Sequence, residues 1–283
     1  MTALNMNSRL SNGDLGVLLR HWRQVRGRSQ FDLSNETGVS QRHISFIESG
    51  RSAPSRQKLM EIAQALDVPL RDRNALLLAA GYAPIYSEGA WDAEEMQSVT
   101  NALHRMLRQH EPFPALVMDR YWNVLIKNDS ARRFFNCFID MDARQGPRNM
   151  LHLIFDPKGL RPFVANWEVT AKSLIERVNR ESVGRVVDIK TKQLLAELLA
   201  YPDVRSEWKA PKTANVMPLV PLGFVKDGRV LNYFSMISTV GTPQTVAAQE
   251  LRIECMFPAD DETESEHIKM LGDHARFDRV SAG

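Results

Sequence analysis

Residues 29–55 read SQFDLSNETGVSQRHISFIESGRSAPS, and this stretch decides the fold of the first part of the chain. It holds two short amphipathic segments, residues 29–37 and 40–49, on either side of Gly38. Glycine allows a sharp turn there because it enters left-handed backbone conformations without steric cost. Ser40 then lies where its side chain can accept a hydrogen bond from the free amides of a following helix. This order of segments predicts a helix-turn-helix.

The second of these segments has two different faces. Ile44 and Ile47 lie one helical turn apart and predict an inner face that packs on Leu33 and Val39. The other face carries Gln, Arg and Ser, which can bond base edges in the major groove, Gln to adenine and Arg to guanine. The candidate DNA-binding residues are Gln30, Ser40, Gln41, Arg42, His43, Ser45, Phe46 and Arg51, of which Gln30 and Arg51 are the phosphate candidates.

These positions resemble the signature of phage-repressor-type (XRE-like) DNA-binding domains. The matching residues are Gln30, Gly38-Val39-Ser40, Ile44-Ser45, Glu48-Ser49-Gly50-Arg51 and Pro54-Ser55. The resemblance extends from residue 15 to about residue 86 and implies a five-helix bundle. It also implies that Glu48 caps or pairs within the domain and does not read bases. An ordinary helical hairpin with a polar outer face is the alternative that this pattern leaves open.

Charge agrees with a DNA-binding first domain. Residues 1–86 carry eleven basic and seven acidic side chains, a net charge of +4, and the remainder of the chain carries −2. The basic excess therefore lies where phosphate would be met. A first helix containing Leu15 and Trp22, a fourth after Ser55 and a fifth over residues 70–80 complete the expected bundle.

Composition and motifs exclude several classes of protein. No apolar run nears the ~18 residues of a membrane span, residues 1–12 lack a signal peptide pattern, and two cysteines suit a reducing cytoplasm. The chain has no Gly-rich phosphate loop, paired-carboxylate motif or nucleophile elbow, and its His and Cys residues lack metal-ligand spacing. We therefore expect a cytoplasmic protein that is not an enzyme, with no catalytic residues, no metal, no cofactor and no membrane contact.

The chain's 283 residues have room for about two domains. We expect a DNA-binding domain at residues 9–86, a linker helix at 87–111, a second domain at 112–272 and a flexible tail at 273–283. The boundary is indicated by Gly, Pro and Ser at residues 82–89. The helical pattern at residues 92–111 fits two alternatives, a linker that also touches a partner subunit and a helix packed on its own domain.

From Pro112 the pattern changes to strands, then helices, then strands. Strands are expected at residues 115–119, 123–127, 215–222, 229–240 and 249–257, with Asp227-Gly228 as a turn. Helices are expected at residues 129–138, 149–155, 160–181, 188–200 and 262–271. One sheet can pair the early and late strands across the helical insert and leave a cavity between sheet and helices. The predicted fold class is α+β.

This second part resembles the ligand-binding domain of MmyB-like transcription regulators. The matching residues are Pro114-Ala115-Leu116-Val117-Met118-Asp119, Trp122-Asn123-Val124, Asn128, Leu151, Phe155-Asp156-Pro157, Leu160-Arg161-Pro162, Asn166-Trp167-Glu168 and Gly241-Thr242-Pro243. The resemblance implies a PAS-like domain that binds a small, fatty-acid-like molecule without a covalent bond. Residues after Lys212 follow the family pattern only loosely.

A surplus of bulky apolar residues supports a ligand pocket, since such pockets are mostly apolar with a few polar anchors. The candidate ligand-binding residues are Trp122, Asn123, Asn128, Phe134, Phe155, Arg161, Asn166 and Trp167, and Arg161 can meet a carboxylate. Core packing is the alternative for each aromatic residue.

Together these features predict a transcription regulator whose partners are a double-stranded DNA operator, a small-molecule effector and a second copy of the chain. A DNA-binding protein with a ligand-free dimerisation domain is the main alternative. An enzyme fused to a DNA-binding head is a third.

Overall fold

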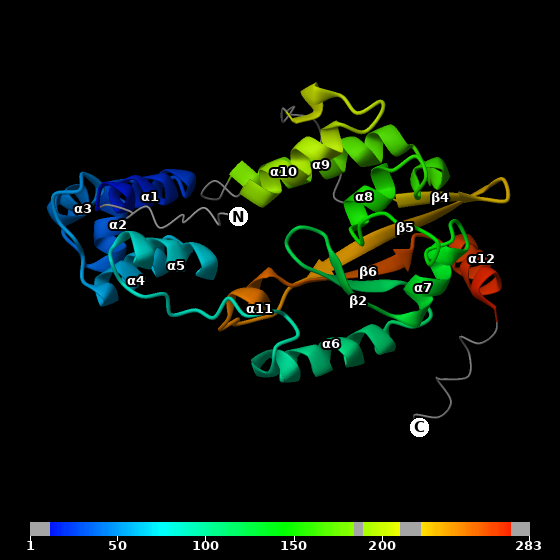
Figure 1. Cartoon of the computed structure of the whole chain (residues 1–283), viewed down its shortest axis with the longest axis horizontal. Helices are drawn as coiled ribbons and strands as arrows, with labels where there is room; N and C mark the ends of the chain where they lie inside the picture. The colour runs from blue at the N-terminus through cyan, green and yellow to red at the C-terminus, as the bar shows by residue number, and fades with distance from the viewer. Residues whose placement is uncertain (1–11, 184–188, 210–221, 273–283) are drawn as a thin grey trace, which may run out of the picture. The chain divides into compact units, whose positions relative to one another are not determined.

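The computed structural model describes residues 12–183, 189–209 and 222–272, in which the chain forms two compact units (Figure 1). The first unit contains residues 12–89 together with Val183 and residues 243–249. The second contains the remaining described residues. A short segment from late in the sequence therefore belongs to the same unit as the first helices.

Residues 12–89 fold into the five helices that the sequence predicts. They are α1 (Asn12–Val25), α2 (Gln30–Thr37), α3 (Gln41–Glu48), α4 (Arg56–Ala65) and α5 (Leu70–Ala79). Trp22, Leu33 and Leu59 are each at most 2% exposed at the centre of the bundle. These apolar faces bury one contiguous core, which is the main force that holds the short helices together.

Local sequence sets the joints around α2 and α3. Ser29 accepts a hydrogen bond from the Asp32 amide, and the Asp32 carboxylate accepts one from the Ser29 amide. Gly38 ends α2 at φ 65°, a left-handed conformation that glycine adopts easily. The Ser40 side chain accepts from the His43 amide and starts α3. The glycine turn and the Ser40 cap are thus confirmed.

The second unit is built on an antiparallel sheet. Its strands are β1 (Ala115–Met118), β2 (Val124–Lys127), β3 (Val164–Ala165), β4 (Leu222–Lys226), β5 (Arg229–Ser238) and β6 (Arg252–Pro258), in the order β2-β1-β6-β5-β4-β3. Asp227 and Gly228, at φ 49° and 79°, form the predicted turn between β4 and β5. The early strand β1 pairs with the late strand β6, so one sheet spans the helical insert as predicted.

Helices cover both faces of this sheet. They are η1 (Glu94–Met96), α6 (Gln97–Gln109), α7 (Asp129–Asn136), α8 (Met150–Phe155), η2 (Arg161–Phe163), α9 (Trp167–Val183), α10 (Ile189–Leu199), η3 (Ser206–Lys209) and α12 (Asp261–Leu271), while α11 (Val246–Glu250) lies between β5 and β6. In Figure 1, α8, α9 and α10 lie on one side of the sheet and α6 lies on the other. The unit is therefore a mixed α+β domain.

Helix α6 packs on the domain that follows it. Leu103 and Leu107 are buried, and α6 contacts β1. Of the two alternatives for this helical pattern, packing on its own domain is therefore present in the structure. Contact with a partner subunit stays a prediction.

Three elements differ from those that the sequence predicts. The strand β4 runs over Leu222–Lys226, whereas the sequence predicts a strand that ends at residue 222. Residues 160–181 do not form one helix but η2, β3 and α9, because Pro162 has no N–H to continue a helix and Asn166 takes a left-handed conformation at φ 52°. Residues 249–251 do not begin a strand, because the Gln249 amide bonds the Thr245 carbonyl and closes a helical turn. Of the predicted strand at 215–222 only Leu222 lies within the described residues, and the predicted tail lies outside them.

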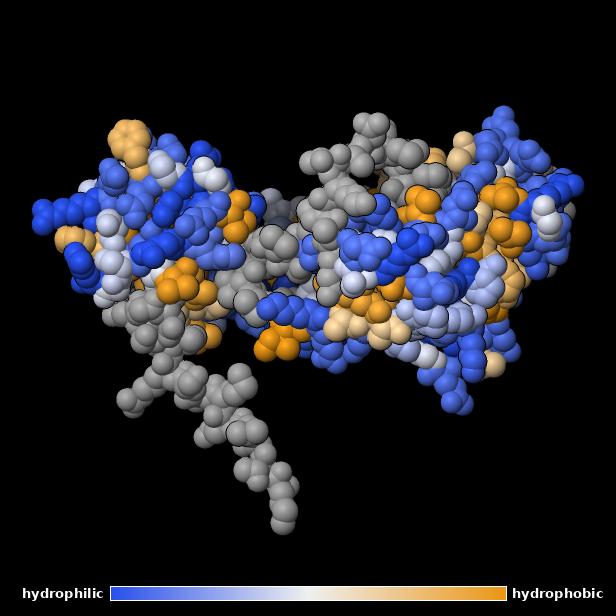
Figure 2. All heavy atoms as spheres, turned by 90° about the horizontal axis from the view of Figure 1, so that it is seen from above, coloured by the Kyte–Doolittle hydropathy of each residue, from blue (hydrophilic) through white to orange (hydrophobic). Residues whose placement is uncertain are grey.

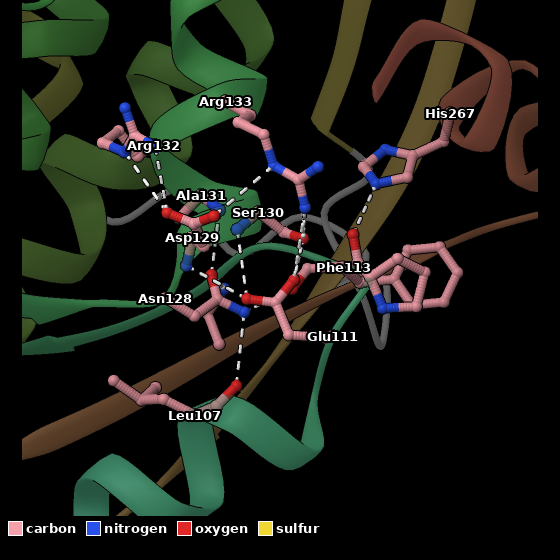
Figure 3. A network of polar contacts seen from close by, with 12 residues as sticks. Leu107, Glu111, Phe113, Asn128, Asp129, Ser130, Ala131, Arg132, Arg133 and His267 are labelled. Atoms are coloured by element: carbon pink, nitrogen blue, oxygen red, sulfur yellow. Dashed lines mark hydrogen bonds and ion pairs between the residues drawn. The ribbon is translucent and has the colours of Figure 1, made fainter. Parts of the chain in front are cut away.

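His267 on α12 is fully buried and is held at both ring nitrogens. Its Nδ1 lies 2.8 Å from the Tyr233 hydroxyl. Its Nε2 lies 3.0 Å from the Pro112 carbonyl, and Figure 3 shows this contact of the ring. A neutral ring satisfies both contacts, since the hydroxyl donates to Nδ1 and Nε2–H donates to the carbonyl. Burial lowers the pKa of His267, so the native protein resists its protonation.

We predict that His267 makes the free energy of unfolding fall as the pH is lowered from 7 to 5. Its contribution is complete above the ordinary histidine pKa of about 6.5 and is lost at lower pH, by at most about 1.4 kcal/mol per pH unit, because only the unfolded state takes up the proton. Urea unfolding of His267→Gln should show a smaller decrease than the parent. The exposed His104→Gln is the control, and equal decreases in all three proteins would contradict the prediction.

Candidate functional site

The orientation of α3 is fixed by the residues on its inner face. Ile44 and Ile47 are at most 2% exposed, and the helix packs against α1 and α2. Gly16 on α1 permits a close approach, since a Cβ there would lie 2.5 Å from the Glu48 carbonyl oxygen. Helix α1 therefore lies directly against the C-terminal end of α3.

A buried carboxylate joins three of the helices. The Glu48 side chain is 2% exposed, and Arg23 donates to its two oxygens at 2.6 and 3.0 Å. Gln30 Nε2 donates to the same carboxylate at 2.9 Å. Burial alone would raise the pKa of Glu48, but the hydrogen bonds from Arg23 and Gln30 outweigh it and hold the pKa below its usual range. Glu48 thus pairs within the domain, as the sequence implies, and ties α1 and α2 to α3.

The outer side of α3 carries the predicted DNA-binding residues. Exposed are Ser40, Gln41, Arg42 and Arg51, and half-buried are Gln30, His43, Ser45 and Phe46. Figure 2 shows hydrophilic side chains over most of the visible surface of this unit. The structure therefore gathers these residues on α3 and on the segments that flank it.

Phe46 organises the cations on this surface. The guanidinium carbon of Arg42 lies 5.3 Å from the centre of the Phe46 ring, and that of Arg51 lies 5.9 Å away. Cation–π contacts of this kind are worth about 0.5–1 kcal/mol at exposed sites, enough to bias both side chains toward the ring. His43 Nε2 lies 3.4 Å from the Ser52 hydroxyl. Two guanidinium groups are thus held beside one half-exposed aromatic ring.

In the second unit, Asn128 lies at the centre of a polar network (Figure 3). It caps α7, since its Oδ1 accepts from the amides of Ala131 and Ala115 at 2.9 and 3.0 Å. Its Nδ2 donates to the carbonyls of Phe113 and Leu107 at 2.8 and 3.3 Å.

Glu111 completes this network. Its carboxylate accepts from the amides of Asp129 and Ser130 and from the Ser130 hydroxyl, and it lies 3.8 Å from Arg133 Nη2 (Figure 3). The network fixes the start of α7 against the end of α6. A ligand contact of Asn128 stays a prediction.

Three of the predicted ligand residues lie together. The guanidinium carbon of Arg161 is 3.8 Å from the centre of the Trp167 ring, and the ring of Phe155 is 5.9 Å from it. Arg161 also donates to the Pro202 carbonyl at 2.8 Å and to the Asp203 carboxylate at 2.6 Å. The Arg161 guanidinium therefore already binds a carboxylate of the same chain.

The remaining four make other contacts, although Asn166 directly precedes Trp167 in the chain. Trp122 is buried, with the guanidinium carbon of Arg177 4.6 Å from its ring centre, and Asn123 bonds Asp119 in the turn before β2. Phe134 is fully buried among aromatic rings, and Asn166 precedes α9. For all eight residues, contact with a ligand stays a prediction.

A pocket of about 310 Å³ lies beside the β1–β2 hairpin. It is lined by Leu116, Val124, Leu125, Ile126, Lys127, Phe135, Met141, Asp142, Arg144, Gly146, Pro147, Arg148, Asn149, Met150 and Leu153. The lining combines apolar side chains with an even larger share of polar surface, and Lys127 and Arg148 are exposed cations. Arg144 is paired with Asp156 at 3.1 Å. The arrangement suits an amphipathic molecule with an anionic end.

None of the eight predicted ligand residues is among those that line this pocket. The sequence pattern did not indicate Lys127, Arg144 and Arg148, because isolated cations in polar segments are ordinarily surface residues. The available signal was their position in the sequence. Lys127 ends a strand, and the two arginines lie in the short polar segment before the apolar run that begins at Met150. Arg23 was not indicated either, because its pairing with Glu48 depends on the packing of α1 on α3.

Two family models match the chain. The one described as the MmyB-like transcription regulator ligand binding domain matches residues 99–267, which is more than half of the chain. The one described as a helix-turn-helix matches residues 19–72. No curated protein matches. Across the described ranges, no helix combines the length and the apolar character that crossing a membrane requires.

We predict that Glu48→Gln destabilises the first unit by about 3 kcal/mol, because the substitution leaves the Arg23 guanidinium without its buried counter-charge. Hydrogen exchange of peptides covering α1 and α3 measures the local free energy of opening. The matched control is Glu61→Gln, which breaks the exposed pair with Lys58 and should cost less than about 1 kcal/mol. Similar losses in the two variants would contradict the role given to Glu48.

Proposed function

The chain belongs to the MmyB-like family of transcription regulators, and we propose that it binds an operator in a sequence-specific manner under the control of a hydrophobic ligand. It is a DNA-binding transcription regulator with a ligand-binding domain. The observation that carries the proposal is the exposed outer side of α3, whose orientation the buried Glu48 carboxylate fixes.

The first turn of α3 is the part proposed to read bases. Gln41 and Arg42 are exposed there, and their amide and guanidinium groups can each make two hydrogen bonds to one base. Phe46, one turn further along, can contact a thymine methyl group. Arg51 follows the helix and is proposed to bind phosphate. Gln30 is proposed to contribute through the first turn of α2, since its side-chain amide already bonds Glu48.

The ligand is proposed to be fatty-acid-like and to bind without a covalent bond in a PAS-like domain. The pocket beside the β1–β2 hairpin supports an amphipathic anion, because it is lined by apolar side chains such as Phe135 and Leu153 and by exposed Lys127 and Arg148. The family resemblance instead points to the residues around Trp122 and Trp167. Binding is proposed to be the whole task of this domain, with no catalysis, metal or cofactor.

The protein is proposed to act in the cytoplasm as a homodimer. One recognition helix reads only a few base pairs, and two copies would read an inverted repeat whose half-sites lie about 10–10.5 base pairs apart or at a multiple of that spacing. The competing proposal is a DNA-binding protein whose second domain only dimerises. Mass spectrometry of small molecules that co-purify with the chain distinguishes the two.

We predict that Arg42→Ala loses specific operator binding while the fold is retained, because a bidentate base contact supplies about 1–3 kcal/mol of discrimination. The measurement is competition between operator and non-specific duplex DNA at a fixed salt concentration. Arg105→Ala, which removes an exposed arginine on α6, is the control. An Arg42→Ala protein that prefers its operator as strongly as the parent would show that α3 does not read bases through this residue.

We predict that Arg148→Ala weakens binding of decanoate by about three- to tenfold, because the variant removes a cation at the pocket rim worth about 1 kcal/mol. Titration calorimetry with decanoate measures the effect, and decanol, which lacks the charge, should bind both proteins alike. Arg132→Ala removes an exposed arginine on α7 and serves as the control. Decanoate binding that is insensitive to Arg148 would place the anionic end elsewhere.

A further inference from the structure

Helix α5 begins without a cap from its own sequence. Its first residue is Leu70, and the preceding Pro69 makes no side-chain hydrogen bond to the helix. The first amides of a helix have no partner inside it, and Leu70 is only 6% exposed, so water has little access to it. The Leu70 amide instead donates to Gln249 Oε1 at 2.7 Å. The cap of α5 therefore comes from a residue 179 positions later.

Gln249 belongs to the short helix α11, between β5 and β6, and α11 is firmly attached to the first unit. Val246 is fully buried and Ala248 is 4% exposed. The Val246 amide donates to the Ser87 carbonyl at 2.9 Å. Residues 243–249 accordingly form one compact unit with α1 to α5.

The segment that receives α11 is itself fixed to α5. Asn74, which is 1% exposed, donates to the Tyr86 carbonyl at 2.8 Å and accepts from the Tyr86 amide at 3.1 Å. Arg71 and Glu88 form an ion pair at 2.7 Å. Residues 85–88 thus lie on α5 and hold α11 through Ser87.

Glu250, the residue that follows Gln249, is held by the second unit. Glu250 pairs with Arg120 at 2.8 Å, and the two side chains are 14% and 6% exposed. Arg120 lies in the turn between β1 and β2, and β6 begins at Arg252, opposite Met118 of β1. Two adjacent residues, Gln249 and Glu250, therefore make partly buried polar contacts in different units.

Helix α5 is also connected to α3, through α1. It packs against α1, and Leu76 and Leu77 share a core with Trp22. Helix α1 in turn supplies Arg23 to the buried Glu48 at the end of α3. A change at the start of α5 can thus reach α3 through packed helices and one ion pair.

We infer that residues 246–250 transmit the state of the ligand-binding domain to the DNA-binding helices, with Gln249 as the positioning residue. The inference rests on the proposed function and adds the route of coupling to it. A displacement at the ends of β1 and β6 moves Glu250 and changes the bond between Gln249 and Leu70. Linkage is reciprocal, so operator binding must change the strand ends in the second unit through the same residues.

The test uses the full chain and an operator selected by that chain from random duplex DNA. Hydrogen exchange of peptides covering Arg120 and the start of β6 is measured with and without this operator. The parent should show a clear change on binding. Gln249→Met, which has no acceptor of comparable strength, should reduce that change at least about threefold while operator affinity stays within about threefold, since coupling and binding are separate free energies.

Three comparisons make the result specific. Gln249→Glu keeps an acceptor at the positive end of α5 and should retain the change seen in the parent. Gln109→Met removes an exposed glutamine of α6 and should also behave like the parent. Glu250→Gln, which weakens the pair with Arg120, should lose the change as Gln249→Met does and replaces that variant if it does not fold.

If a folded Gln249→Met protein shows the same change in hydrogen exchange on operator binding as the parent does, the inference is overturned. Loss of the change in both Gln249→Met and Gln249→Glu also overturns it, because the acceptor would then not be the cause. Failure of the parent to enrich any DNA sequence is a different result. That result would contradict the proposed function before any variant is compared, and the inference that rests on it would fall as well.

Discussion

The carboxylate of Glu48 must be matched by positive charge inside the protein, and the arrangement of the DNA-binding helices depends on that requirement. An ionised carboxylate that is shielded from water is costly unless it is paired and hydrogen-bonded. Arg23 from α1 and Gln30 from α2 meet the requirement at the end of α3. Since the three helices share one buried charge, they keep a fixed mutual geometry, and the exposed side of α3 is presented by a rigid support.

The second unit is held together by a core of packed aromatic rings. Its centre is filled by aromatic rings at edge-to-face distances, for example 5.1 Å between Phe134 and Phe224 and 5.3 Å between Phe134 and Tyr233. Aromatic pairs favour such arrangements, which leave little free volume. One pocket lies instead beside the β1–β2 hairpin, where apolar side chains meet exposed cations. Core packing, the alternative for the aromatic residues, is therefore present in the structure for Phe134, and ligand contact stays a prediction.

The elements predicted well from sequence are those whose cause is local. Gly38 and Ser40 act within a few residues, as does the Asp227-Gly228 turn, and the helical periodicity of α1 to α5 comes from one shared core. The break before α9 was missed because it depends on the left-handed conformation of Asn166, which the surrounding apolar pattern did not indicate.

The functional sites likewise combine features that local sequence predicts with features that depend on contacts between distant segments. The outer face of α3 follows from the spacing of two isoleucines, so its residues could be predicted. The pairing of Arg23 with Glu48 spans 25 positions, and the bond between Leu70 and Gln249 spans 179. The pocket is assembled from a hairpin, α7, a loop and α8. Each of these depends on which elements become neighbours, and a single sequence gives no direct signal of that.

The inclusion of residues 243–249 in the first unit has a consequence for synthesis of the protein. Domains generally fold in order as the chain leaves the ribosome, N-terminal parts first. Here the amide of Leu70 meets its acceptor, and Val246 its buried position, only after most of the second domain has been made. An unfinished or truncated chain therefore carries DNA-binding helices that lack part of their own structure, and the unit is completed at nearly the same moment as the domain that regulates it.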